Sequence, residues 1–106
     1  MWDRPTNPLE IAASVLRPET IWAVRSGGFT HAAYLILDRW ALNNPDELKQ
    51  LEQQGELAFL LRLDQQETME KRTLCSDSAW QASRQGMSDF EILHEAGIEM
   101  ALRVNF

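Results

Sequence analysis

Two histidines, His31 and His94, are the side chains best suited to acid–base chemistry at neutral pH. His31 is followed seven residues later by Asp38. In a helix this spacing separates the two side chains by about 10 Å along the axis, so they cannot contact each other. A catalytic arrangement would need a nucleophile from elsewhere, such as Cys75 or a serine. We therefore expect His31 to be a surface or partly hydrogen-bonded histidine.

His94 follows Glu91 by three residues, which places a carboxylate and an imidazole on adjacent turns of a helix. Di-iron carboxylate bundles use two copies of this spacing together with further glutamates. This chain has one copy, because no acidic residue precedes His31 by three positions. Two histidines and one cysteine are too few for a zinc site rich in these residues within a monomer. The sequence therefore predicts no metal and no other cofactor.

Cys75 is the single cysteine, so the chain has no internal disulfide. Lys71 and Arg72 precede it closely enough to activate a thiol, but no nucleophile signature surrounds it. We interpret Cys75 as a small buried hydrophobe. The adjacent glycines Gly27 and Gly28 match neither pattern of phosphate-binding loop. These residues together predict a protein with no catalysis of its own.

Acidic residues are concentrated in the second part of the chain. Of 16 acids and 10 bases, residues 1–45 hold four of each, so residues 46–106 carry the whole net charge of −6. A negative field repels phosphate backbones, which makes nucleic acid an unfavourable partner. The same acidity allows an alternative function, a nucleic-acid mimic that blocks a DNA- or RNA-binding partner. Its phosphate-like carboxylates would be those of Asp46, Glu47, Glu52, Glu56, Asp64, Glu67 and Glu70.

Residues 83–104, SRQGMSDFEILHEAGIEMALRV, resemble the middle of a helix-turn-helix motif. They provide a helix, a capped helix, an Ala-Gly-Ile turn and a candidate recognition segment. The resemblance implies a DNA-binding regulator that would use Arg84 and Arg103. The recognition segment departs from the motif, because Arg103 is its one base, it contains Glu99, and it alternates like a strand. DNA binding is therefore the alternative interpretation.

The stretch that must position all of these side chains is residues 29–42, FTHAAYLILDRWAL, in which ten of the fourteen residues are apolar. At helical spacing six apolar residues share one face and His31 and Asp38 lie on the opposite side. The sequence predicts a mainly α fold, a compact bundle of six or seven short helices around this central buried helix. Residues 1–106 form a single domain. The core face consists of Phe29, Ala32, Ala33, Ile36, Leu37 and Trp40.

Capping signals predict the other helices. Asn7, Pro8 and Glu10 form a start signal for a helix over 8–16, and Ser88 with Glu91 forms a capping box. The remaining helices are expected over 45–54, from Ser76 or Asp77 to a closing Gly86, and over 88–96 before Gly97.

Two segments fit either a helix or a strand. In residues 20–25 the apolar positions satisfy both periods, and a helix is slightly favoured. Residues 57–63 alternate as a strand does, yet good helix formers follow them without a turn signal. We therefore favour one helix over about 57–72.

The C-terminal residues 98–106 alternate between apolar and mainly polar side chains, which indicates a half-buried strand and makes an α+β fold the alternative. No second clear strand precedes it, so its free edge needs a partner. Pairing with a second copy of the chain predicts a homodimer. The expected interaction residues are Ile98, Met100, Leu102, Val104 and Phe106.

The composition, 44% hydrophobic and 25% charged, is typical of a globular domain. No apolar stretch is long enough to span a membrane, and residues 1–8 lack the pattern of a secretory signal, so we expect a cytoplasmic protein. Four tryptophans, Trp2, Trp22, Trp40 and Trp80, suit a core and an interface. We expect a regulator or adaptor that acts through contacts with a protein of unknown identity.

Overall fold

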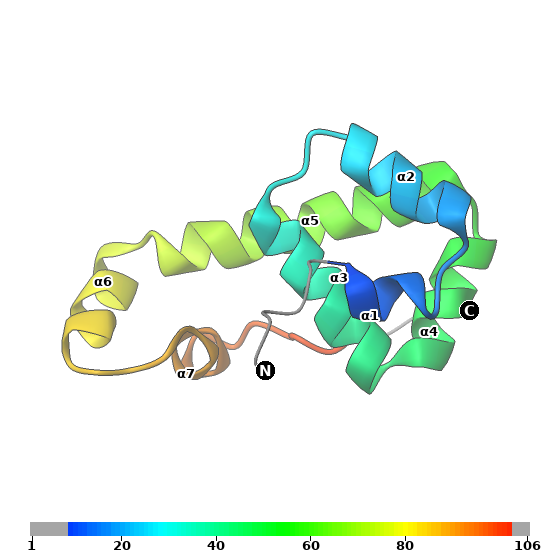
Figure 1. Ribbon diagram of the computed structural model, residues 1–106. Helices are drawn as coiled ribbons and strands as arrows, with labels where there is room; N and C mark the ends of the chain where they lie inside the picture. Colours follow the sequence, from blue (N-terminus) through cyan, green and yellow to red (C-terminus); the bar gives the residue numbers. More distant parts are fainter. Residues whose placement is uncertain (1–8, 103–106) are drawn as a thin grey trace, which may run out of the picture.

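The computed structural model describes residues 9–102, which form seven helices and no strand (Figure 1). This confirms the mainly α bundle. None of these helices is long and apolar enough to cross a membrane. The helices are α1 (Glu10–Ala13), α2 (Pro18–Ser26), α3 (His31–Asn43), α4 (Pro45–Gln53), α5 (Glu56–Leu74), α6 (Asp77–Arg84) and α7 (Asp89–Glu95).

Helix α3 is the central element, as its apolar density predicted. It packs against α1, α4 and α5, and Figure 1 shows it passing between α1 and the long helix α5. Trp40 and Leu37 of α3 are fully buried and meet Phe59 and Leu63 of α5 in the same core. The core is therefore built mainly from residues before α6.

Both ambiguous segments are helical. Residues 20–25 lie in α2, where Pro18 occupies the first helical position. Residues 57–63 begin α5, in which Phe59 and Leu63 are buried but Leu57 and Leu61 are exposed. The four-residue spacing of the buried side chains is that of a helix, so the strand-like alternation is coincidental.

Helix α1 is shorter than the predicted helix over 8–16. It runs from Glu10 to Ala13, and the expected cap residues Asn7 and Pro8 lie outside the described residues. Its N-terminal N–H groups are bound instead by a carboxylate from α3. Asp38 Oδ2 accepts the Leu9 N–H and Oδ1 accepts the Ala12 N–H, both at 2.9 Å.

Asp38 is therefore buried, although the sequence places it on the side of the helix opposite the apolar core face. The helical wheel places Asp38 correctly away from Leu37 and Trp40. It could not show that α1 packs over that side of α3 and brings two unpaired N–H groups to the carboxylate.

Two further helices are capped by distant carboxylates. Glu52 of α4 accepts the N–H of Arg17, the residue before α2, at 2.8 Å. Glu67 of α5 accepts the N–H of Thr30 at 3.1 Å and its hydroxyl at 2.8 Å, at the start of α3. Both glutamates are buried. These contacts fix how α2 and α3 enter the bundle.

Helices α6 and α7 are capped locally, as predicted. Ser76 accepts the N–H of Ala79 at 3.2 Å, and Ser88 forms the expected capping box with Glu91. Gly97, with φ of 79°, closes α7, where the Ile98 N–H donates to the Leu93 carbonyl at 3.0 Å. This is the Schellman arrangement that a C-terminal glycine favours.

The predicted C-terminal strand is wrong for residues 98–102, which have no regular secondary structure. Their backbone groups bind side chains of the same chain instead of a neighbouring strand. Met100 O accepts Trp40 Nε1–H at 3.1 Å and Arg39 Nε–H at 3.2 Å, and the Leu102 N–H donates to Asn44 Oδ1 at 3.1 Å. Because every element within residues 9–102 is a helix, this part of the chain offers no strand edge to form a ladder.

Candidate functional site

The residues that could have supplied acid–base chemistry are not brought together. His31 is exposed at the start of α3, whereas Asp38 caps α1. His94 is exposed on α7, and Glu91 of the same helix is engaged in the capping box. Within residues 9–102, no three His, Cys, Asp or Glu side chains converge where they could hold a metal ion.

Cys75 is exposed, so its interpretation as a buried hydrophobe is wrong. It occupies the C-cap position of α5, where its N–H donates to the Lys71 carbonyl at 2.9 Å. A chain that turns away at a helix end leaves such a side chain uncovered, which no local pattern in the sequence indicated.

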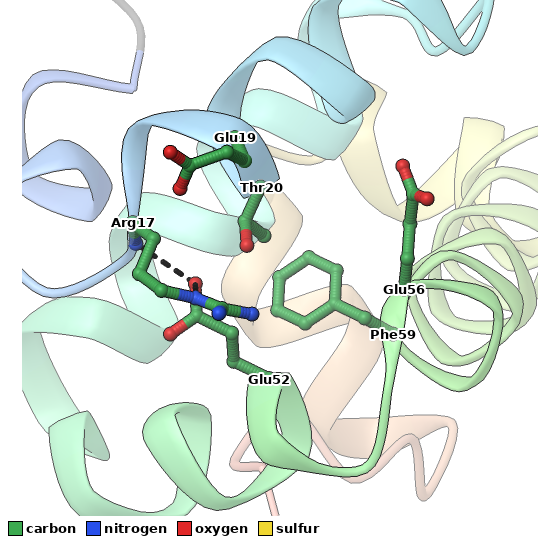
Figure 2. A pocket seen from close by; sticks show the side chains of 6 residues that line it. All are labelled: Arg17, Glu19, Thr20, Glu52, Glu56 and Phe59. Carbon is green, nitrogen blue, oxygen red and sulfur yellow. Dashed lines mark hydrogen bonds and ion pairs between the residues drawn. The ribbon is translucent and has the colours of Figure 1, made fainter.

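A polar hollow lies where α2, α4 and α5 meet. Figure 2 shows the Arg17 side chain reaching across it between Glu52 and the Phe59 ring, with Glu56 at the far side. Arg17 Nε lies 3.6 Å from Glu52 Oε2, which also caps α2. The volume is about 220 Å³, below the range of ordinary ligand sites. We interpret this hollow as a structural contact between α2, α4 and α5, and not as a ligand site.

A buried polar network ties α3 and α5 to the C-terminal segment. Arg39 pairs with Glu70 through both guanidinium ends, with Nη2 2.7 Å from Oε2 and Nη1 3.3 Å from Oε1. Gln66 Nε2–H donates to Glu70 Oε2 at 2.6 Å and to the Glu99 carbonyl at 3.0 Å. Removing one partner would leave buried charges or donors unpaired, so the network holds residues 99–102 on the bundle.

Arg62 of α5 lies over the ring of the buried Trp40. Its guanidinium carbon lies 5.1 Å from the centre of the Trp40 ring, and its Nη1–H donates to Gln66 at 3.0 Å. Burial lowers the pKa of Arg62, and the negative charge of Glu70 acts in the opposite direction. The guanidinium remains charged, because the pKa of an arginine lies far above neutrality.

An apolar groove lies along α3, and we call it the α3–α7 groove. Helix α3 contributes most of its lining, with further residues from α1, α5 and α7. Its volume is about 470 Å³, within the range of ligand and peptide sites. It is lined by Ile11, Ala32, Leu35, Ile36, Asp38, Arg39, Leu42, Asn43, Glu70, Leu74, Asp89, Phe90 and Leu93.

Three large apolar side chains of the groove are exposed to solvent. Leu35 is 53% exposed, Leu42 is 67% exposed and Phe90 is 59% exposed. Arg39 lies 6.0 Å from the centre of the Phe90 ring. Sequence reasoning missed this site, although Leu35 and Leu42, seven residues apart and off the predicted core face, were a readable signal.

The tryptophans divide between core and surface. Trp40 is fully buried, whereas Trp22 and Trp80 are exposed, and Trp2 lies outside the described residues. Trp80 stacks with Arg84 on the surface of α6, where the guanidinium carbon lies 4.9 Å from the ring centre. Ala79 is the residue of α6 that is buried.

In the helix-turn-helix segment, the described residues after α7 form no helix that could read DNA. Residues 98–102 are irregular, Arg84 lies against Trp80, and Arg103 is outside the described residues.

Of the seven carboxylates expected to imitate phosphates in a nucleic-acid mimic, three are bonded inside the protein. Those of Glu52, Glu67 and Glu70 are buried and bonded within the chain.

The interaction residues expected at the C-terminus face the chain's own bundle where they are described. Leu102 is buried in the main core, and Ile98 and Met100 are partly buried. Val104 and Phe106 lie outside the described residues. The strand pairing expected for a homodimer would require residues 98–102 to leave the bonds they make with α3 and α5.

Comparisons with models of protein families, with curated proteins and with solved structures found no match for this chain.

Proposed function

We propose that this protein is a cytoplasmic regulator or adaptor that binds another protein through the α3–α7 groove. The observation that supports this is the exposure of Leu35, Leu42 and Phe90 along one concave surface. Covering apolar surface contributes about 25 cal/mol per Å², and monomeric proteins rarely leave large contiguous patches uncovered. A partner that fills the groove would remove these side chains from water.

The polar groups of the groove favour binding over chemistry. Asp38 accepts two backbone N–H groups and Glu70 is bonded to Arg39, so both carboxylates are held in structural contacts. A general base needs a free position within hydrogen-bond reach of a substrate proton. The groove instead combines apolar walls with a few charged groups at its margin, which is typical of a docking surface.

Site-specific photo-crosslinking in the native cell tests this proposal. A photoreactive phenylalanine analogue at position 42 or 90 is compared with the same analogue at position 57 or 61, because Leu57 and Leu61 are also exposed, at 71% and 60%. We expect discrete protein adducts from the groove positions and none of the same mass from the control positions. Excess unlabelled protein should compete for these adducts, whereas a Leu35→Ser, Leu42→Ser double variant should not.

Two results would reject the groove as the docking site. One is the absence of adducts from positions 42 and 90 although the protein is folded. The other is a set of identical adducts from positions 42, 57, 61 and 90, which would indicate contact without a defined surface.

A further inference from the structure

We propose that the groove binds an amphipathic helix that carries Lys or Arg beside its apolar face. This proposal rests on the function proposed above and names the class of partner. It follows from the spacing of the exposed apolar side chains and from the charge of the groove.

The spacing fits a helix. Leu35 and Leu42 are seven residues apart on α3, so they lie two turns, or about 10 Å, from each other along the axis. An apolar helix repeats its side chains at the same interval, which is why helices dock in grooves through residues i, i+3, i+4 and i+7. A peptide that binds by adding a strand needs a sheet edge to pair with, and residues 9–102 contain no strand.

The charge of the groove selects a basic helix. Four charged residues line it, and the charges of Arg39 and Glu70 cancel in their ion pair. Asp38 is buried and both of its carboxylate oxygens accept N–H groups of the chain, whereas Asp89 is exposed at the edge of the groove. The carboxylate that an occupant can reach is therefore that of Asp89, on a chain whose net charge is −6.

The same charges argue against a second copy of the chain as the occupant. A two-fold contact brings the same surface patch of each subunit together. The negatively charged Asp89 side chains of the two copies would then lie close to each other. Like charges across an interface oppose binding, whereas Lys or Arg on a partner would be attracted to Asp89.

Synthetic peptides provide the probe. A 14-residue peptide with leucines on one helical face and lysines on the other is compared with a peptide that has the same leucines and glutamates in place of lysines. A third peptide has the leucine–lysine composition in scrambled order. Fluorescence anisotropy measures affinity, and NMR shifts locate the site. We expect the amphipathic lysine peptide to bind at least about tenfold more tightly than either other peptide, with shifts centred on Leu35, Leu42 and Phe90.

Matched variants separate groove binding from general attraction to an acidic protein. The Leu35→Ser, Leu42→Ser double variant should lose about tenfold in affinity, whereas Leu57→Ser, Leu61→Ser should not change it. Asp89→Asn should weaken binding several-fold, whereas Asp64→Asn, which removes an exposed charge elsewhere on α5, should have little effect. Circular dichroism checks that each variant remains helical.

Several outcomes would overturn the proposal. Equal affinity for the scrambled peptide, or equal losses in Asp64→Asn and Asp89→Asn, would mean unspecific charge attraction. Equal affinity for the glutamate peptide would reject the basic partner. Light scattering that gives twice 12.2 kDa for the free protein, falling to one copy in the leucine double variant, would make a second copy the occupant.

The proposed function fails separately from this inference. Groove adducts in the crosslinking experiment, combined with no preference for the lysine peptide, would leave a docking site with a different partner class. Absence of groove adducts together with specific peptide binding would show a competent groove that the cell does not use.

Discussion

Two regions of this protein hold their helices in opposite ways. In the body, residues 9–74, the starts of α1, α2 and α3 are bonded to carboxylates that lie 29, 35 and 37 positions away in the chain. In the hairpin, residues 77–95, each helix start is bonded to a serine three positions away. The body is thus connected by long-range polar contacts and the hairpin by local ones.

This difference indicates that the body and the hairpin unfold with different cooperativity. The main apolar core consists almost entirely of body residues, with Leu102 added from the C-terminal segment. A lost contact in the body affects helices that are distant in sequence, so its cost should spread through the whole fold. A lost cap in the hairpin should open mainly the helix that it caps, because local unfolding follows the least connected elements.

The largest effect should come from Trp40→Ala. This change removes a fully buried ring and its bond to Met100, and such a cavity costs about 3–5 kcal/mol of the free energy of unfolding. Chemical denaturation measures the loss. Trp80→Ala is the matched control, because Trp80 is 62% exposed and loses only its stacking with Arg84, about 0.5–1 kcal/mol. Equal losses in the two variants would remove the distinction between body and hairpin.

Asp38→Ala should destabilise the protein by about 1–3 kcal/mol, because it leaves two buried N–H groups without a partner. Hydrogen exchange should show faster opening of α1 and also of α3. Asp64→Ala, at an exposed position of α5, should change stability by less than about 0.5 kcal/mol. An unchanged unfolding midpoint in Asp38→Ala would show that the long-range cap does not stabilise the body.

Gly97→Ala should cost about 1–2 kcal/mol, since its φ of 79° is unfavourable for a side chain although the surrounding space is open. Gly97→Asn should lose less, because asparagine tolerates this conformation better. Thermal unfolding of the two variants gives the difference. If alanine and asparagine were equally destabilising, the cost would arise from contacts and not from backbone conformation.

Ser88→Ala should have the smallest effect, about 1 kcal/mol, from loss of the α7 capping box. Amide exchange in α7 should accelerate while that of α3 and α5 stays the same. Ser83→Ala, at an exposed position in α6, serves as the control and should leave both regions unchanged. Faster exchange throughout α3 in Ser88→Ala would show that the hairpin and body unfold as one unit.

Much of the helical fold could be predicted from the sequence because its signals are local. The capping box of α7, the glycine after it and the apolar density of α3 depend on residues within a few positions of one another. The exposed leucines of the groove were present in the same pattern, since Leu35 and Leu42 lie off the core face. The sequence did not show that these leucines line a groove, because only tertiary packing places Phe90 of α7 beside them.

The C-terminal segment shows where local signals fail. Its alternation is a genuine strand pattern, but a strand also needs a neighbouring edge. The backbone groups of this segment instead form hydrogen bonds with side chains of the bundle, those of Arg39, Trp40, Asn44 and Gln66.

The sequence by itself determined the helical class, the central helix and the local caps of the hairpin, because periodicity and capping act between residues close in the chain. Only the tertiary structure decided that Asp38, Glu52 and Glu67 are buried caps and that α3, α5 and α7 enclose an apolar groove. A carboxylate is strongly hydrated, and burying it without hydrogen bonds is costly. Its burial therefore depends on N–H groups that folding brings from distant segments.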